Sequence, residues 1–430
     1  MATGTPKRRG DGQWSAIELA YPGKTPKADV LVRKAAPLVD LWTPQDARNA
    51  IIFGDNLDAL TNLRDDPSVR GKVQLVYIDP PYATETAFHT RAQSHAYDDV
   101  HTGDEFIEHL RKRLILLHDL LADDGSLYLH LDDKAVFHAR IILDEIFGRA
   151  GYKNCIARKK CNPKNFTRRQ YGNITDYILF YTKSDRYVWN KPYEPWTEER
   201  AREYQYVEPE TGRRFMKVPV HAPGVRNGAT GETWRGKPPP KGKHWQYPPA
   251  TLDDMDARGE IYWSANGNPR RKVYLDQSPG VAAQDVWLDY RDAHNQNIAV
   301  TGYPTEKNSD LLRRIVAASS NEGGLVLDAF AGSGTTLEAA HALGRRWIGI
   351  DNSPEALRTI LSRFATGRRR MGDFVTRPNS QTTPPSKDAG TAAAAPLIAP
   401  MLYRIQATPP CAETGADLIR SEQNEAAAAE

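Results

Sequence analysis

The tetrapeptide Asp79-Pro80-Pro81-Tyr82 follows immediately after an apolar run at residues 73–78. A central strand cannot continue through two prolines, because proline has no N–H to donate to the sheet, so the chain must leave the sheet here. The Asp79 carboxylate and the Pro80 carbonyl then offer two hydrogen-bond acceptors beside the ring of Tyr82. The exocyclic amine of a flat base has two N–H donors for these acceptors, and the base can stack on the ring. The tetrapeptide therefore predicts a catalytic corner for such an amine.

A glycine turn forms the second candidate site. The apolar run at 325–327 ends at Asp328, and Gly332 and Gly334 follow it. Glycines are needed where the backbone turns sharply and comes close to a ligand, and open α/β sheets bind ligands at the carboxyl ends of their strands. Asp351 ends the next apolar run, where a carboxylate can accept hydrogen bonds from ribose hydroxyls. The two features together predict a ligand that carries a ribose.

Other nucleotide-binding motifs fit this turn less well. Gly334 is followed by two threonines, so the turn lacks the lysine with which a P-loop contacts phosphate. The third glycine of a dinucleotide-binding fingerprint is missing as well. A tight turn without a ligand is the remaining alternative for the turn alone, and the carboxylate of Asp351 weighs against it.

Strands and helices alternate around both candidate sites. Apolar, β-branched runs predict strands at 51–53, 73–78, 126–131, 177–181, 324–328 and 347–351. Apolar residues at helical spacing predict helices that begin near 57 and that span 104–121, 133–147, 308–319 and 335–343. This alternation is typical of a parallel α/β sheet with helices on both faces, and we expect the two stretches to build one sheet.

The middle of the chain has a different composition. Residues 186–297 are rich in proline, glycine and aromatic residues, and six of the nine tryptophans lie there, which predicts a loop-rich domain inserted into the α/β domain. The predicted organisation is a mostly irregular arm at 1–45, a catalytic part at 46–185, the inserted domain at 186–297, a cofactor-binding part at 298–372 and a disordered low-complexity tail at 373–430.

Charge is distributed unevenly along the 430 residues. The whole chain has 57 Lys+Arg and 54 Asp+Glu, whereas residues 151–250 contain 20 Lys+Arg and 9 Asp+Glu. Such a regional excess of positive charge favours contact with a polyanion such as DNA, although any single basic cluster is more often a solvated surface. The residues that we expect to contact DNA are Arg158, Lys159, Lys160, Arg168, Arg169, Arg213 and Arg214.

The sequence also predicts the compartment. No run of about 18 apolar residues predicts a membrane helix, and no apolar signal-peptide segment follows the charged N-terminus. The three cysteines form neither CxxC pairs nor an even framework, which disfavours a zinc site and a disulfide scaffold. We therefore expect a cytoplasmic protein that does not associate with membranes.

The tetrapeptide and the glycine turn together resemble the amino-methylating, S-adenosylmethionine-dependent DNA methyltransferases of the β arrangement. In that family the Asp-Pro-Pro-Tyr tetrapeptide comes early, a target-recognition domain follows and the Phe-x-Gly-x-Gly cofactor turn comes late, which is the order found over about residues 48–365. Residues 259–263 and 268–274 also resemble site-specific adenine methyltransferases, including modification subunits of restriction systems. The resemblance implies a Rossmann-like methyltransferase sheet, circularly ordered, with an inserted target-recognition domain.

The resemblance also implies roles for individual residues. Asp351 would bind the ribose of S-adenosyl-L-methionine and Asp55 its adenine, and the methionine moiety would lie near Thr305 and Lys307. The cofactor-binding set is Asp55, Thr305, Lys307, Asp328, Phe330, Gly332, Gly334, Thr335 and Asp351. The catalytic set is Asp79, Pro80, Pro81 and Tyr82, and no metal ion is required.

The activity implied is site-specific methylation of the N6 amine of a flipped adenine in duplex DNA. The lone pair of an aromatic amine is delocalised, and hydrogen bonds to Asp79 and to the Pro80 carbonyl would favour a tetrahedral nitrogen aimed at the methyl group. The base must leave the duplex, and Tyr82 is the expected stacking partner.

Several alternatives and partners stay open. The N4 amine of cytosine fits the same corner, and an RNA or protein methyltransferase would share the cofactor turn. A DNA-binding module without activity is disfavoured by the intact tetrapeptide. A cytosine-C5 enzyme would need a nucleophilic cysteine, and Cys411 lies in the low-complexity tail. Double-stranded DNA is the expected partner, and a second copy of the chain and a restriction subunit are further candidates.

Overall fold

The chain folds into two units. The computed structural model describes residues 17–44, 47–81, 103–162, 169–292, 306–366 and 400–408, and the backbone of four short strands at 87–89, 95–98, 299–300 and 369–370. Unit 1 combines residues on both sides of an insertion, Met1–Asn190 and Gln284–Glu430, and unit 2 is Lys191–Ala283. The predicted inserted domain, 186–297, extends beyond unit 2 at both ends.

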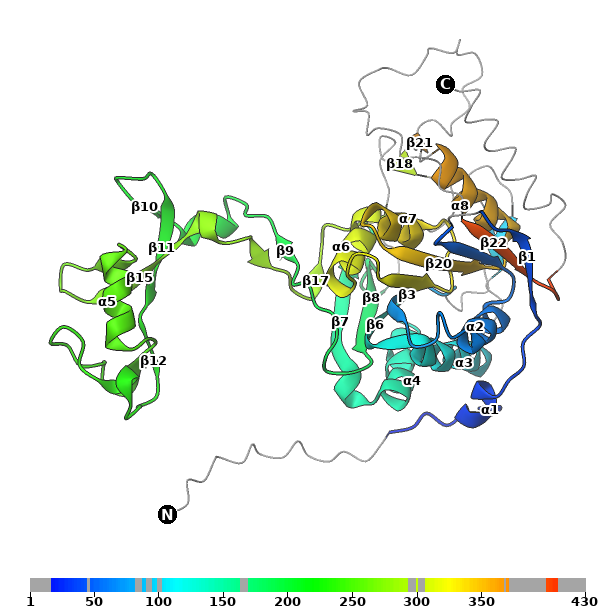
Figure 1. Ribbon diagram of the computed structural model, residues 1–430, viewed down its shortest axis with the longest axis horizontal. Helices are drawn as coiled ribbons and strands as arrows, with labels where there is room; N and C mark the ends of the chain where they lie inside the picture. The colour runs from blue at the N-terminus through cyan, green and yellow to red at the C-terminus, as the bar shows by residue number, and fades with distance from the viewer. Residues whose placement is uncertain are drawn as a thin grey trace, which may run out of the picture. The chain divides into compact units, whose positions relative to one another are not determined.

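Unit 1 is built on one large sheet (Figure 1). The order of its strands is β1 (Leu38–Trp42), β22 (Met401–Ile405), β2 (Ala50–Phe53), β20 (Arg346–Asp351), β19 (Leu325–Asp328), β3 (Val73–Ile78), β6 (Leu121–Leu131), β8 (Thr175–Thr182), β7 (Tyr152–Lys159) and β17 (Val286–Trp287). From β22 to β6 each strand is parallel to its neighbour, and β8 is antiparallel to both β6 and β7. The carboxyl ends of the parallel strands therefore meet at one edge.

Helices cover both faces of this sheet (Figure 1). One face carries α2 (Asn56–Asp65), α3 (Gly103–Leu120) and α4 (Val136–Phe147), and the other carries α6 (Ser309–Ser319), α7 (Thr335–Ala342) and α8 (Pro354–Thr366). Each set of helices packs with sheet residues in a separate hydrophobic core. Because both faces are buried, the parallel strands are apolar along their length, which is the pattern that the sequence shows. The predicted α/β sheet is confirmed.

The remaining elements of unit 1 are short. The helix α1 (Lys27–Leu31) precedes β1, and β4 (Ala87–His89) pairs with β5 (His95–Asp98) in a small hairpin. A second antiparallel pair joins β18 (Ala299–Val300) to β21 (Arg369–Arg370), which are distant in the chain. No helix within the described ranges is long and apolar enough to cross a membrane.

Unit 2 has its own small core. Its main sheet has the order β10 (Tyr206–Val207), β11 (Arg214–Pro219), β15 (Pro269–Tyr274) and β14 (Ile261–Trp263), and two further pairs join β12 (His221–Pro223) to β13 (Lys243–Trp245) and β9 (Tyr193–Glu194) to β16 (Val281–Ala282). The helix α5 (Pro249–Ala257) contributes Leu252 and Met255 to a core with Trp234 and Trp245. The aromatic composition that predicted a separate domain thus supplies its core.

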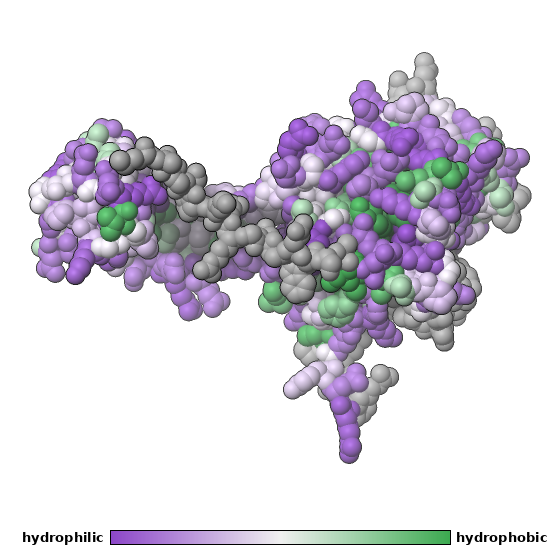
Figure 2. Space-filling view, turned by 90° about the horizontal axis from the view of Figure 1, so that it is seen from below, coloured by the Kyte–Doolittle hydropathy of each residue, from purple (hydrophilic) through white to green (hydrophobic). Residues whose placement is uncertain are grey.

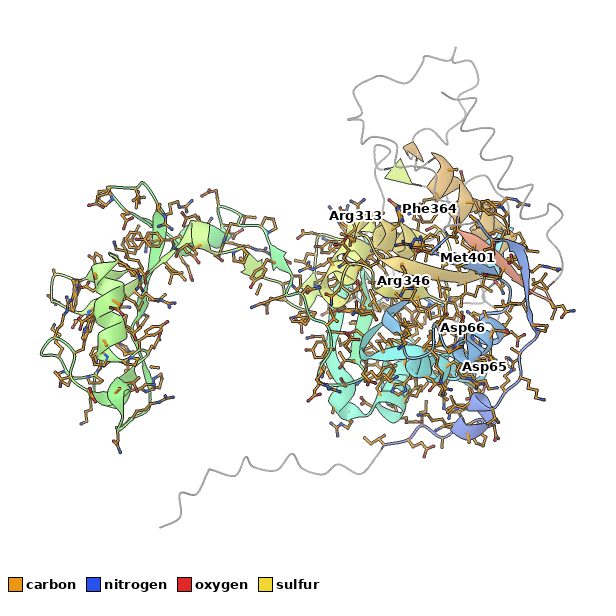
Figure 3. All side chains as sticks on the ribbon, in the orientation of Figure 1. Asp65, Asp66, Arg313, Arg346, Phe364 and Met401 are labelled. Atoms are coloured by element: carbon orange, nitrogen blue, oxygen red, sulfur yellow. The ribbon has the colours of Figure 1, made fainter. Side chains whose placement is uncertain are left out.

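The C-terminal region corrects two of the sequence predictions. Met401–Ile405 forms β22, which lies inside the sheet between β1 and β2, and Figure 3 labels Met401 at its start. The tail was predicted to be disordered and the N-terminal arm mostly irregular, and both predictions are wrong for these two strands. Gly54 explains how the segment fits, because its φ is +142° and a Cβ there would lie 2.8 Å from Cβ of Ile405. A short apolar run inside a low-complexity region gave too weak a signal.

Leu402 tests whether β22 belongs to the sheet. This side chain is fully buried, so Leu402→Ala should lower the free energy of unfolding by about 2–5 kcal/mol through lost burial and the cavity left behind. The same truncation at Leu288, which is 58% exposed, is the matched control and should change it by less than about 0.5 kcal/mol. Equal effects of the two substitutions in denaturant titrations would contradict the placement of β22.

Candidate active site

The glycine turn joins β19 to α7 at the carboxyl edge of the sheet. Gly332 and Gly334 have φ values of +49° and +74°, which residues other than glycine rarely adopt. A Cβ on Gly334 would also lie 2.9 Å from Cγ1 of Ile360 on α8, so this position has no room for a side chain. Phe330 begins the turn, and its N–H donates to the carboxylate of Asp328 at 3.0 Å.

Asp351 holds this turn from the neighbouring strand. One of its carboxylate oxygens accepts the N–H of Gly332 at 2.8 Å, and the other accepts the N–H of Ser353 at 2.9 Å. Burial raises the pKa of Asp351, which these backbone hydrogen bonds counteract. Each carboxylate oxygen can accept more than one hydrogen bond, so Asp351 can hold the turn and still accept from a ribose hydroxyl.

Arg363 of α8 fixes the start of α7. Its guanidinium is buried and hydrogen bonds to the Thr335 hydroxyl at 3.2 Å, and it also pairs with Glu306 and Glu338. Glu306 directly precedes Lys307 in the chain, so Arg363 connects the cofactor turn to the segment that carries this lysine. The sequence predicted neither α8 nor a role for Arg363.

Asp55 and its neighbour Asn56 lie at the end of β2. The Asp55 carboxylate caps α2 by accepting the N–H of Leu57 at 2.8 Å, and it pairs with Arg113 at 3.0 Å. The Asn56 side-chain amide donates to the carbonyl of Ala329 at 2.7 Å, which ties this strand end to the glycine turn. The predicted cofactor residue Asp55 is therefore beside the turn, and Asn56 is a contact that sequence reasoning missed.

Asp79 and Lys307 form an ion pair at the end of β3. Oδ2 of Asp79 lies 2.7 Å from Nζ of Lys307, and both side chains are largely buried. Burial alone would lower the pKa of Lys307, but the carboxylates of Asp79, Asp292 and Asp176 together outweigh this effect and raise it. Lys307 immediately precedes Asn308, which caps α6. The sequence analysis assigned Lys307 to the cofactor, and the structure adds that it fixes the predicted catalytic carboxylate.

Three predicted residues lie outside the described part of the chain: Tyr82, Thr305 and Arg168. The structure describes Pro80 as buried and Pro81 as half-buried, directly after β3. It thus brings together, at one edge of the sheet, Asp79, Pro80 and Pro81 with the described members of the predicted cofactor set.

The predicted DNA contacts fare differently. Arg158 is wrong as a surface contact, because it is fully buried and donates to Asp176 at 2.8 Å and to the carbonyl of Tyr290 at 2.8 Å. A basic run in the sequence does not reveal that one of its members points into the core. Its neighbours Lys159 and Lys160 are half-buried, and Arg169 is exposed.

Arg213 and Arg214 belong to unit 2 and have partners within it. Arg213 makes two hydrogen bonds of 2.7 Å to Asp276, and Arg214 donates to the carbonyl oxygens of Ala201 and Tyr204. Contact of these two residues with DNA stays a prediction, and each contact would compete with a bond inside unit 2.

The pKa of Asp328 gives a pH test of this edge. Burial, opposed by hydrogen bonds from Thr336 and Phe330, raises its pKa to about 7. In the unfolded chain the same carboxyl ionises near pH 4. The folded state therefore holds this proton more tightly, so the contribution to stability is complete below about pH 4 and is lost as the pH rises to about 7.

Asp328→Asn should remove this pH dependence while keeping the acceptor for Phe330. We expect the free energy of unfolding of the wild type to fall, relative to the variant, by a few kcal/mol between pH 4 and pH 7. Denaturant titrations at several pH values measure the difference. A difference that is constant with pH would show that Asp328 is ionised throughout.

Comparisons with known proteins identify the family of this chain. The sequence profile of the DNA methylase family matches residues 73–362. The chain is 47% identical over 378 residues to the type II methyltransferase M.EcaI of Enterobacter cloacae, covering 86% of this chain and 82% of the relative. It is 26% identical to the type III restriction-modification enzyme StyLTI Mod subunit of Salmonella typhimurium over 338 residues, 70% of this chain and half the length of that relative.

Solved structures give weaker likenesses. The complex of M1.HpyAVI with S-adenosylmethionine aligns with a TM-score of 0.40 and 17% identity, over 73% of this chain and 98% of that one. The cytosine-N4-specific PvuII DNA methyltransferase aligns with a TM-score of 0.38 and 14% identity, over 73% and 85% of the two chains. From the match of the family profile and the identity to M.EcaI, the chain belongs to the DNA methylase family of S-adenosylmethionine-dependent methyltransferases.

Proposed function

We propose that this DNA methyltransferase modifies the N6 amine of adenine in duplex DNA, with Asp79 and the Pro80 carbonyl as the acceptors for that amine. The observation that carries the proposal is the position of Asp79, which lies at the same sheet edge as the glycine turn and has one carboxylate oxygen held 2.7 Å from Nζ of Lys307. A fixed carboxylate at the cofactor edge is what the positioning of a weak amine nucleophile requires.

The residues around the glycine turn fit the cofactor. Gly332 and Gly334 have no side chains that would keep a ligand away from the backbone of the turn, and Asp351 can accept from hydroxyls of a ribose. S-Adenosyl-L-methionine, when bound, supplies an electrophilic methyl group. The carboxylates at this edge also suit a ligand with a positively charged sulfur.

Asp79 then has a defined task. Its carboxylate accepts an N–H of the target amine, and the Pro80 carbonyl accepts the second, so that the lone pair of the nitrogen is directed away from both acceptors. Lys307 limits the rotation of the carboxylate by holding Oδ2. Tyr82, the next aromatic residue in the chain, is the proposed stacking partner of the flipped base.

Adenine is the favoured target, and cytosine N4 is the second candidate because its amine fits the same acceptors. The two stretches whose sequences resemble adenine methyltransferases, 259–263 and 268–274, contain β14 and β15 of unit 2. Because the relatives named above are a type II methyltransferase and a type III modification subunit, we place the chain in a restriction-modification system.

Labelled methyl transfer followed by nucleoside analysis tests the target base. The protein is incubated with mixed-sequence duplex DNA and labelled S-adenosyl-L-methionine, and the DNA is digested and separated by liquid chromatography with mass detection. We expect label in N6-methyladenine. Label in N4-methylcytosine would show that cytosine, and not adenine, is the target base. The absence of label from every duplex would contradict DNA methylation.

Asp79→Asn separates the catalytic carboxylate from DNA binding. The amide keeps the shape of the side chain but loses the charge and the ion pair with Lys307, so methyl transfer should fall by about 100-fold or more while DNA affinity changes little. Asp123→Asn is the matched control, because Asp123 is exposed and lies near the amino end of β6, and it should leave both quantities unchanged. Full turnover in Asp79→Asn would refute the assigned role.

Unit 2 offers a surface for the DNA. Paired residues of neighbouring strands point to the same face of a sheet, so the register places one set of basic and aromatic residues together: Tyr206, Phe215, Lys217, Tyr262, Arg270 and Lys272. Nζ of Lys217 lies 3.5 Å and 3.4 Å from the ring centres of Tyr206 and Tyr262. We call this set the basic face.

Charge separates the basic face from the rest of unit 2. Arg270 is exposed, and together with Lys243 it adds to the effect of burial in lowering the pKa of His221 on the adjoining β12, which shows that these cations cluster. Three aspartates lie on α5, which packs against the opposite face through Ile261. The surface of unit 2 seen in Figure 2 is mostly hydrophilic, as a DNA-contacting domain requires.

Salt-dependent DNA binding tests the basic face. Lys217→Ala and Arg270→Ala should each weaken binding and reduce the slope of log affinity against log salt concentration by about 1, the value for one lost phosphate contact. Arg258→Ala is the matched control, because Arg258 is exposed and pairs with Glu260 just beyond α5. Fluorescence anisotropy with duplex DNA measures the affinity of all three variants. Unchanged slopes in Lys217→Ala and Arg270→Ala would exclude the basic face as a DNA-binding surface.

A further inference from the structure

A row of polar side chains lies buried beside Asp79. In β3, β6, β8 and β7, alternate residues point into the core under α6–α8, and Tyr77, Tyr128, Ile178 and Ile156 mark that face. Counting by two along each strand places a further set on the same face: Asp79, His130, Asp176 and Arg158. His130, Asp176 and Arg158 are at most 2% exposed. A histidine and two charged residues thus occupy core positions on three adjacent strands.

Short distances connect these groups. Nδ1 of His130 lies 2.8 Å from the hydroxyl of Tyr77, and Nε2 lies 2.9 Å from Oδ2 of Asp176. Arg158 donates to the same Oδ2 at 2.8 Å. On the other side, Nδ1 of His130 is 4.0 Å from Oδ1 of Asp79, the oxygen not held by Lys307. His130 therefore lies between the catalytic carboxylate and a second, buried carboxylate.

Charged groups of both signs surround His130 in the described part of the chain. They include three carboxylates, Asp79, Asp176 and Asp292, and two cations, Arg158 and Lys307. Burial alone would raise the pKa of Asp176, but His130 and Arg158 lower it well below its usual range, so this carboxylate stays ionised.

We propose that His130 is a positioning residue for methyl transfer, which acts through Asp79 and is active in its neutral form. The proposal rests on the proposed function of Asp79. In the neutral ring, Nε2 lies 2.9 Å from Oδ2 of Asp176 and Nδ1 accepts the hydroxyl of Tyr77, and Asp79 retains its full charge as an acceptor. A proton on Nδ1 places a second cation 4.0 Å from Asp79 and weakens that acceptor.

Charged and titratable groups from several described elements face His130. Tyr77 and Asp79 come from β3 and its end, Asp176 from β8 and Arg158 from β7, and Lys307 and Asp292 complete the cluster. Asp328 of β19 acts more remotely, through Tyr77 and Asp79. A buried ion network without a catalytic role is the competing explanation, and it predicts loss of stability without a change in pH dependence.

The pH dependence of single-turnover methyl transfer distinguishes the two explanations. We expect the wild-type rate to fall as the pH is lowered from 8.5 to about 5.5, and Asp176→Asn to move this fall to lower pH by about one unit, because the imidazole loses its proton more readily without the anion. His130→Gln, which cannot titrate, should lose the fall altogether and react at a reduced rate.

A control variant and two possible outcomes test whether the pH dependence belongs to His130. His118→Gln should behave as the wild type, because His118 packs against Phe147 on the other face of the sheet. A fall that persists in His130→Gln belongs to another group, with Asp328 as the candidate, and would overturn the proposal. An unmoved profile in Asp176→Asn would overturn it too.

A second measurement needs neither methyl transfer nor a folded His130→Gln variant. Nitrogen NMR of the labelled imidazole follows the titration of His130 in the wild type and in Asp79→Asn. Removal of the Asp79 charge should shift the titration midpoint to lower pH by about one unit, and an equal midpoint would overturn the proposal. A wild-type protein that methylates no DNA would refute the proposed function and leave this NMR test intact.

Discussion

The parallel pairing of six strands is the constraint on which the rest of the structure depends. Parallel strands end at the same edge, so Asp79, Asp328 and Asp351 are brought together at the ends of β3, β19 and β20. Each carboxylate needs a different form of stabilisation there. Asp79 has the ion pair with Lys307, Asp351 accepts two backbone N–H groups, and burial keeps Asp328 protonated up to about pH 7. The three carboxylates can therefore have three tasks in one small region.

Segments distant in sequence hold this edge in place. Lys307 reaches Asp79 from the segment before α6, and Arg363 of α8 holds both that segment, through Glu306, and the start of α7. Asn56 connects β2 to the glycine turn. The glycine turn and the Asp79 corner are thus connected through hydrogen bonds and ion pairs from other segments.

The sequence predicted what depends on local patterns. Apolar runs and helical spacing identified six of the sheet strands and five of the helices that cover them, but missed β7 and α8, and the Asp79 corner and the glycine turn were found because each is a contiguous motif. It did not predict β22, since five residues in a low-complexity region carry little signal, nor the burial of Arg158, since a basic run looks solvated. His130 lies within the apolar run of β6, where a histidine can be noticed, but its partners come from two other strands, β3 and β8.

Single-molecule sequencing of genomic DNA from cells that express this protein tests the central claim most directly. The method reports the modified base and its sequence context together, and cells that express Asp79→Ala provide the background. The account predicts N6-methyladenine in one recurring sequence context with the wild type and its absence with the variant. Equal methylation in the two cultures, or no modified base in either, would contradict it.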